Sequence, residues 1–134
     1  FMFLLLFIQS FLGGLVASNY AGLACQGFPT CNGDWWPVME GSIFIQMIHR
    51  IVAFIIIGFA VYFYILYKRF HMENWFHKNI KSLSKKALLL LSAQILVGIS
   101  NIYLAIPTLL SILHLGLAAL LLVVFLKLSL ELAP

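Results

Sequence analysis

Four long apolar runs leave this chain few ways to fold. Each approaches the roughly 20 residues that an α-helix needs to cross a bilayer, and they lie at about residues 1–17, 43–67, 87–106 and 109–128. With 63% hydrophobic and only 9% charged residues, the 134-residue chain does not have the composition of a soluble domain. We predict an all-α integral membrane protein, a single four-transmembrane-helix bundle with short loops.

The first run opens on Phe1, without a methionine or a charged flank, so we expect residues upstream of it. Small residues around 16–21 also offer a cleavage site, as in a signal peptide, but no basic segment precedes the run. We therefore predict that the first run is a span.

Basic residues gather in one connection, between the second and third runs. Six of the eight lysines and arginines lie in residues 68–86, and the positive-inside rule places such a loop on the cytoplasmic or matrix side. We expect a bacterial cytoplasmic or mitochondrial inner membrane, with residues 19–42 as an outer loop. Lysines next to a span have this topological role, so we expect lipid as their partner and no nucleic acid.

The two cysteines, Cys25 and Cys31, lie together in the predicted outer loop. In an oxidising compartment such a pair is expected to form a disulfide. Two roles stay open: a structural staple that closes a small loop, or a redox-active pair that exchanges with a partner thiol. Two cysteines alone are too few for a zinc site.

Two histidines lie inside the apolar runs, where ionisable side chains are costly and often functional. His49 lies about seven residues into the second span and His114 about six residues into the fourth. Both spans start on the outer side, so each imidazole is predicted roughly 10 Å below the outer interface at 1.5 Å per residue. Two level imidazoles facing one another across a bundle suit the axial positions of a haem iron. The alternative is two packing residues, each hydrogen-bonded within the bundle.

Two polar neighbours of His49 are further candidates for cofactor binding. Arg50 either reaches outward to lipid headgroups or pairs with a haem propionate, for which a guanidinium fork is suited. Gln46 lies one turn before His49 on the same helix face. Its neutral amide can hydrogen-bond a ligand or a bridging water but cannot act as a general acid or base.

A short motif recurs before each histidine-bearing span. The pattern Gln-x-x-x-Gly occurs at Gln9 and Gly13 in the first span and at Gln94 and Gly98 in the third. Its recurrence in register with His49 predicts two repeated helical hairpins, each of which contributes one histidine.

Three segments together resemble the haem A synthase family of cytochrome oxidase biogenesis. They are residues 22–33 around the cysteine pair, the Gln-Met-Ile-His-Arg motif of residues 46–50 and the Ile-Leu-His-Leu motif of residues 112–115. Members of that family usually contain two related four-helix halves. One half carries the haem O substrate, whose methyl group is oxidised to a formyl group, and the other holds a b-type haem. This chain matches one half.

The resemblance implies His49 and His114 as axial ligands of haem b, with haem O as the other candidate ligand. It also implies that Cys25 and Cys31 are the family's outer-loop pair. In the catalytic half an acidic residue stands three positions before the histidine. Gln46 stands there in this chain, so the haem-b half is the nearer resemblance. A partner is then expected: a second four-helix half, a second copy, or a protein of cytochrome oxidase or haem biosynthesis.

Three functions follow from these observations. The first is conversion of haem O to haem A, or retention of the b-type haem for that reaction. The second is a non-catalytic b-type cytochrome or oxidase-associated accessory subunit, and the third is a structural membrane subunit without a cofactor. The first predicts bound haem, with conversion of haem O only if an acidic catalytic partner is present. The second predicts bound haem without haem A, and the third predicts no haem.

Overall fold

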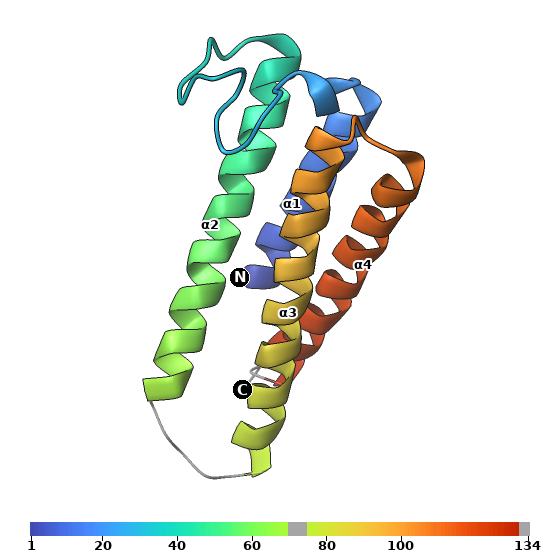
Figure 1. Ribbon diagram of the computed structural model, residues 1–134. Coiled ribbons are helices and arrows are strands. Elements are labelled where there is room, and N and C mark those ends of the chain that lie inside the picture. Colours follow the sequence, from blue (N-terminus) through green and yellow to red (C-terminus); the bar gives the residue numbers. More distant parts are fainter. Residues whose placement is uncertain (70–74, 132–134) are drawn as a thin grey trace.

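The computed structural model describes residues 1–69 and 75–131, and the helices within them are the only regular elements longer than a turn. The helices are α1 (Met2–Ser18), α2 (Gly41–Arg69), α3 (Trp75–Tyr103) and α4 (Thr108–Glu131), with a short 3₁₀ turn η1 (Ala21–Leu23) after α1. They run alternately up and down, and the loop after α1 and the α3–α4 turn lie at the same end (Figure 1). The predicted all-α four-helix membrane fold is confirmed.

Three of the four helices are long and apolar enough to cross a membrane: Gly41–Leu66 within α2, Ile80–Tyr103 within α3, and α4. Helix α1 is also apolar but is shorter, at 17 residues. Many large apolar side chains on the outside of the bundle are exposed, among them Leu89, Leu115 and Val123. Such a surface matches a lipid environment rather than water.

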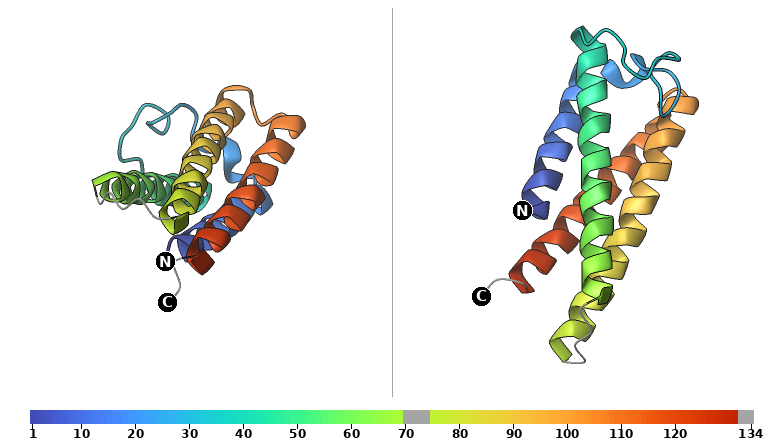
Figure 2. Two further views of the ribbon diagram at one scale, coloured as in Figure 1. Left: turned by 90° about the horizontal axis from the view of Figure 1, so that it is seen from below. Right: turned by 90° about the vertical axis from the view of Figure 1, so that its left-hand side faces the viewer.

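The helices pack as two hairpins joined through their first and last members. Helix α1 packs along α2, α3 packs along α4, and α1 also packs against α4, whereas α2 and α3 contact each other much less. Figure 2 shows the same arrangement from two further directions. That one hairpin repeats the other stays a prediction.

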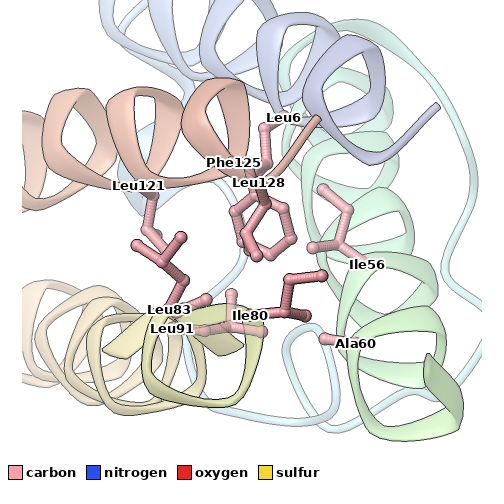
Figure 3. Close-up of a cluster of buried hydrophobic side chains, with 10 residues drawn as sticks. Leu6, Ile56, Ala60, Ile80, Leu83, Leu91, Leu121, Phe125 and Leu128 are labelled. Atoms are coloured by element: carbon pink, nitrogen blue, oxygen red, sulfur yellow. The ribbon is translucent and has the colours of Figure 1, made fainter. Parts of the chain in front are cut away.

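The apolar core lies in the half of the bundle away from the outer loop. Ile56 on α2 and Leu121 on α4 are each 1% exposed, and side chains from all four helices converge on them (Figure 3). Burial of such aliphatic side chains stabilises a helical bundle through close packing.

Helix α3 begins earlier than the apolar run predicts. Residues 75–86 are helical, although they fall in the expected loop 68–86, of which residues 70–74 lie outside the described part. Ile80, Leu83 and Ala87 are buried along one face, while Lys81 and Lys85 are exposed on another. Spacings of three and four residues make this an amphipathic helix rather than a loop. The expected loop is therefore helical over residues 75–86, and its place outside the membrane stays a prediction.

The α3–α4 connection is a tight turn at Leu104–Pro107. Ala105 and Ile106 adopt φ values of +57° and +56°, which a β-branched residue such as isoleucine rarely does. The Ile106 backbone N–H donates to the Asn101 carbonyl at 2.7 Å, which closes the end of α3. The Ile106 side chain then packs at Gly22 of η1, so closely that a methyl group on Gly22 would collide with it.

Candidate functional site

His49 lies between α2 and α1, in contact with the first Gln-x-x-x-Gly motif. The Gln9 Nε2 atom donates to the His49 carbonyl oxygen at 3.0 Å and lies 3.4 Å from the His49 Nε2 atom. One turn later Gly13 faces the imidazole, because a Cβ on that glycine would lie 3.3 Å from His49 Cε1. The absence of a side chain at Gly13 leaves room for the ring.

His114 meets the second motif in the same way. The Gln94 Nε2 atom lies 3.2 Å from the His114 Nε2 atom. A Cβ on Gly98 would lie 3.0 Å from His114 Cε1, which is closer than at Gly13. Sequence reasoning found both motifs through their recurrence, but it did not assign their glutamines to the histidines.

The other ring nitrogen is free of hydrogen bonds in both histidines. His49 Nδ1 and His114 Nδ1 are buried and have no hydrogen-bond partner. Buried polar atoms without partners are uncommon in proteins and call for an explanation.

Arg50 is anchored to the outer loop. Its guanidinium donates from Nη1 to the Thr30 carbonyl at 3.0 Å and from Nη2 to the Cys25 carbonyl at 2.7 Å. The side chain is only 6% exposed. These two carbonyls hold the guanidinium in place, and its Nε atom is buried without a partner.

Gln46 is anchored in the same region. Its Nε2 atom donates to the Gly22 carbonyl at 3.3 Å, and its Oε1 atom is buried without a partner. Gln46 and Arg50 are one turn apart on α2, so together they attach the outer loop to the helix that carries His49. Sequence reasoning missed this role because the acceptors are backbone carbonyls, which any residue type supplies.

The outer loop is closed by the disulfide between Cys25 and Cys31, which are six residues apart. Both cysteines are 0% exposed and pack against Met47 of α2, with Met39 and Ile43 alongside. Asn32 braces the ring, since its Oδ1 atom accepts from the Gln26 N–H at 2.9 Å and its Nδ2 atom donates to the Ala24 carbonyl at 3.1 Å. Burial of this kind favours the structural staple over a redox-active pair.

The loop also reaches the second hairpin. The Tyr103 hydroxyl at the end of α3 donates to the Phe28 carbonyl at 3.4 Å, and Ile106 packs at Gly22. The Phe28 ring stacks on Phe54 of α2 with a centroid separation of 5.8 Å. Residues 22–31 therefore cover the same end of both hairpins.

Two imidazoles define the chemistry that this region can support. Within residues 1–69 and 75–131, no group of three or more His, Cys, Asp or Glu side chains gathers as a metal site needs. A porphyrin, however, supplies four of the six ligands to its iron, so two axial imidazoles are enough. Two half-buried histidines, each beside a glycine that leaves room for the ring, fit that donor set.

Comparison with known proteins identifies the family. The profile of the family described as cytochrome oxidase assembly protein matches residues 1–126, nearly the whole chain. The chain belongs to the haem A synthase family. No solved structure gives a significant match.

Several curated proteins named heme A synthase show the same relationship. The protein of Paracoccus denitrificans is 30% identical over 122 residues, which cover 82% of this chain and 31% of that protein. The protein of Shewanella oneidensis is 32% identical over 137 aligned positions, which cover 85% of this chain and 39% of that protein. The protein of Caulobacter vibrioides is 30% identical over 129 aligned positions, which cover 88% of this chain and 37% of that protein. This chain thus spans about a third of the length of these members of the haem A synthase family.

Proposed function

We propose that this chain binds a b-type haem within the membrane, with His49 and His114 as the axial ligands, and serves haem A formation. Membership of the haem A synthase family and the names of its relatives support the biosynthetic role. The observation that carries the ligand assignment is the pair of imidazoles, each placed against a glutamine and a glycine of the neighbouring helix. A bound haem would supply one-electron transfer at this depth in the bilayer.

Each residue of the candidate site would have a separate task in such a protein. His49 and His114 would supply neutral imidazole nitrogens, which bind iron only when unprotonated. Arg50, held by the carbonyls of Thr30 and Cys25, would keep a positive charge close to the ligand-bearing turn of α2. An anionic propionate at the outer edge of the porphyrin would be attracted by that charge. Gln46 would fix the same turn through Gly22.

A second candidate is a b-type cytochrome or oxidase-associated subunit that holds haem without forming haem A. The specific observation is Gln46, whose amide is bound to a loop carbonyl and cannot transfer protons as an acid would. On the family pattern, the acidic residue that this chain lacks would come from a second four-helix half or from another copy. Conversion of haem O by this chain therefore requires such a partner, within a bacterial membrane and with the basic residues 68–86 on the cytoplasmic side.

The test is a reduced-minus-oxidised absorption spectrum of the detergent-purified full chain, with pyridine extraction to identify any haem. Wild type is expected to give a six-coordinate b-type spectrum, which His49→Ala and His114→Ala each abolish. His77→Ala is the control, since the sequence places it in the basic segment. A folded wild type without haem would refute the proposal and favour a structural subunit. A haem O turnover assay then separates an enzyme from an electron carrier.

A further inference from the structure

The carboxamide of Gln9 determines where the proton of His49 lies. An amide nitrogen carries two hydrogens and accepts no hydrogen bond. One hydrogen goes to the His49 carbonyl at 3.0 Å, which fixes Nε2 rather than Oε1 on this side. The second faces His49 Nε2 at 3.4 Å. Since two donors cannot bond one another, His49 Nε2 is the acceptor and a neutral ring carries its proton on Nδ1.

The same nitrogen faces His114. Gln94 Nε2 lies 3.2 Å from His114 Nε2. The carbonyl bond that orients the Gln9 amide is not repeated at Gln94, so we assign the same tautomer to His114 from the parallel with the first motif. In both residues that Nδ1 atom is buried without a partner. Each ring therefore holds one buried N–H group without a hydrogen-bond acceptor, which costs free energy of folding. A residue that served packing alone would not need this costly group.

The glycine of each motif lies beside the edge of the imidazole ring. The Cε1 atom, which lies between the two ring nitrogens, is 3.3 Å from the Cβ position of Gly13 in His49 and 3.0 Å from that of Gly98 in His114. A Cβ atom added at Gly14 on α1 or at Gly116 on α4 would have no neighbouring atom within 4 Å. The room is therefore local to the glycine one turn after each glutamine.

We propose that Gln9 and Gln94 are positioning residues that hold His49 and His114 in the tautomer with a free Nε2 lone pair. Gly13 and Gly98 leave the space in which that ring orientation fits. A metal binds the unprotonated nitrogen of an imidazole, so the glutamines preset the ligating atom and yield it when iron binds. This inference rests on the proposed function for its purpose, but the tautomer itself is independent of haem.

A simple interhelical contact is the competing explanation. Glutamine and histidine side chains hydrogen-bond across membrane helices without any link to a cofactor. Such a contact tolerates either tautomer, and its loss weakens packing without selecting a ring nitrogen. Measurements of the proton position and of the effect of an acceptor at residue 9 or 94 therefore separate the two explanations.

The first experiment is ¹⁵N NMR of the haem-free full chain with labelled histidine in detergent micelles. We expect protonated Nδ1 and unprotonated Nε2 at His49 and His114. Gln9→Leu should release that preference at His49 alone and Gln94→Leu at His114 alone, so each variant is the control for the other. Gln26→Leu, in the outer loop, should change neither. A wild type with the proton on Nε2, or variants that leave the tautomers unchanged, would overturn the proposal.

The second experiment is a titration with haemin b of wild type and of the leucine and glutamate variants at both positions. A carboxylate only accepts, so Gln9→Glu draws the proton onto His49 Nε2 and masks the ligating atom. We expect the glutamate variant to bind haemin at least tenfold more weakly than Gln9→Leu. The leucine variant loses only the packing and the hydrogen bond, so the additional loss in the glutamate variant measures the effect of the misplaced proton. Equal affinities would overturn the positioning role.

The two experiments fail separately. A wild type that binds no haemin but shows both Nδ1 protons contradicts the proposed function and leaves the tautomer assignment in place. A wild type that binds haemin, but whose histidines carry the proton on Nε2 in the haem-free state, supports the proposed function and contradicts the tautomer assignment. Circular dichroism of each variant shows whether the helices are intact, and the leucine variants decide the question if a glutamate variant does not fold.

Discussion

The two hairpins of this protein present a histidine in similar ways but are joined differently. In each, a glutamine and a glycine of the first helix meet the histidine of the second. Between α1 and α2, residues 19–40 fold into a braced loop with a disulfide, whereas α3 and α4 are joined by residues 104–107 alone. The loop is attached to α2 next to its histidine, through Arg50. His114 is flanked by Leu113 and Leu115, both exposed.

This difference between the hairpins shows that the contacts of a histidine ring with a glutamine and a glycine do not depend on a disulfide loop. The glutamine and glycine suffice for the contacts at His114, in a hairpin whose connection is four residues long. The loop adds a second set of restraints on the other hairpin and reaches across to Tyr103 and Ile106. Variants of the loop should therefore affect His49 more than His114, whereas variants of the motifs should affect each histidine separately.

The largest effect is expected for Arg50→Ala. Two hydrogen bonds from a buried charged group to the carbonyls of Cys25 and Thr30 would be lost, which we expect to lower the free energy of unfolding by about 3 kcal/mol. Thermal unfolding in detergent, followed by circular dichroism, measures it. Lys127→Ala on the exposed surface of α4 is the control. If the two variants unfold alike, the loop does not restrain the first hairpin and the contrast between the hairpins fails.

The next effect is expected for the double variant Cys25→Ala with Cys31→Ala. A cross-link between residues six apart restricts the unfolded chain, and its removal should cost about 2 kcal/mol. A reductant should lower the midpoint of thermal unfolding of the wild type toward that of the double variant and leave the double variant unchanged. The ring signals of His49 should broaden more than those of His114, and an equal response at both would contradict the proposed asymmetry.

A smaller effect is expected for alanine at the two motif glycines. The tighter contact at Gly98 predicts that Gly98→Ala costs about 1 to 2 kcal/mol through overpacking against His114, and that Gly13→Ala costs less. Gly116→Ala and Gly14→Ala are matched controls, since neither new methyl group meets an atom within 4 Å. Unfolding midpoints of the four variants measure this series. A larger loss at Gly13 than at Gly98 would reverse the comparison.

The smallest effect is expected for the glutamines. An interhelical hydrogen bond in a membrane protein is worth about 0.6 kcal/mol on average. Gln9→Leu removes two contacts to His49 and Gln94→Leu removes one contact to His114, so the first should be the more destabilising. Double-mutant cycles with His49→Ala and His114→Ala isolate each pair. Since alanine at residue 49 keeps the backbone carbonyl, the cycle reports the ring contact alone, and a Gln9→Leu variant that is no more destabilised than Gln94→Leu would show that the carbonyl contact adds nothing.

Much of the fold could be predicted from the sequence because apolar runs of spanning length have few alternatives. The four helices and the disulfide pair follow from this patterning and from the position of the cysteines. The start of α3 could not be predicted from apolar runs. Its first turns carry lysines on one face, and only the spacing of Ile80, Leu83 and Ala87 reveals a buried side.

The candidate site could be predicted only in part. The histidines are conspicuous because ionisable residues are rare in spans. The part of Arg50 in holding the loop could not be inferred, since its partners are the carbonyls of Thr30 and Cys25, and a carbonyl has no signature in the sequence. The link from Gln9 and Gln94 to the rings depends on which helices are neighbours and how they rotate, which a recurring motif suggests but does not specify.

The burial of Cys25 and Cys31 has a consequence for how the protein matures. Both cysteines are 0% exposed beneath Met47 and the neighbouring residues of α2. An oxidant that closes the bond must therefore reach the thiols before the loop docks on that helix. Arg50 binds the carbonyls of the closed ring. We therefore expect the bond to form before the loop docks, so that oxidation of the thiols precedes completion of the first hairpin.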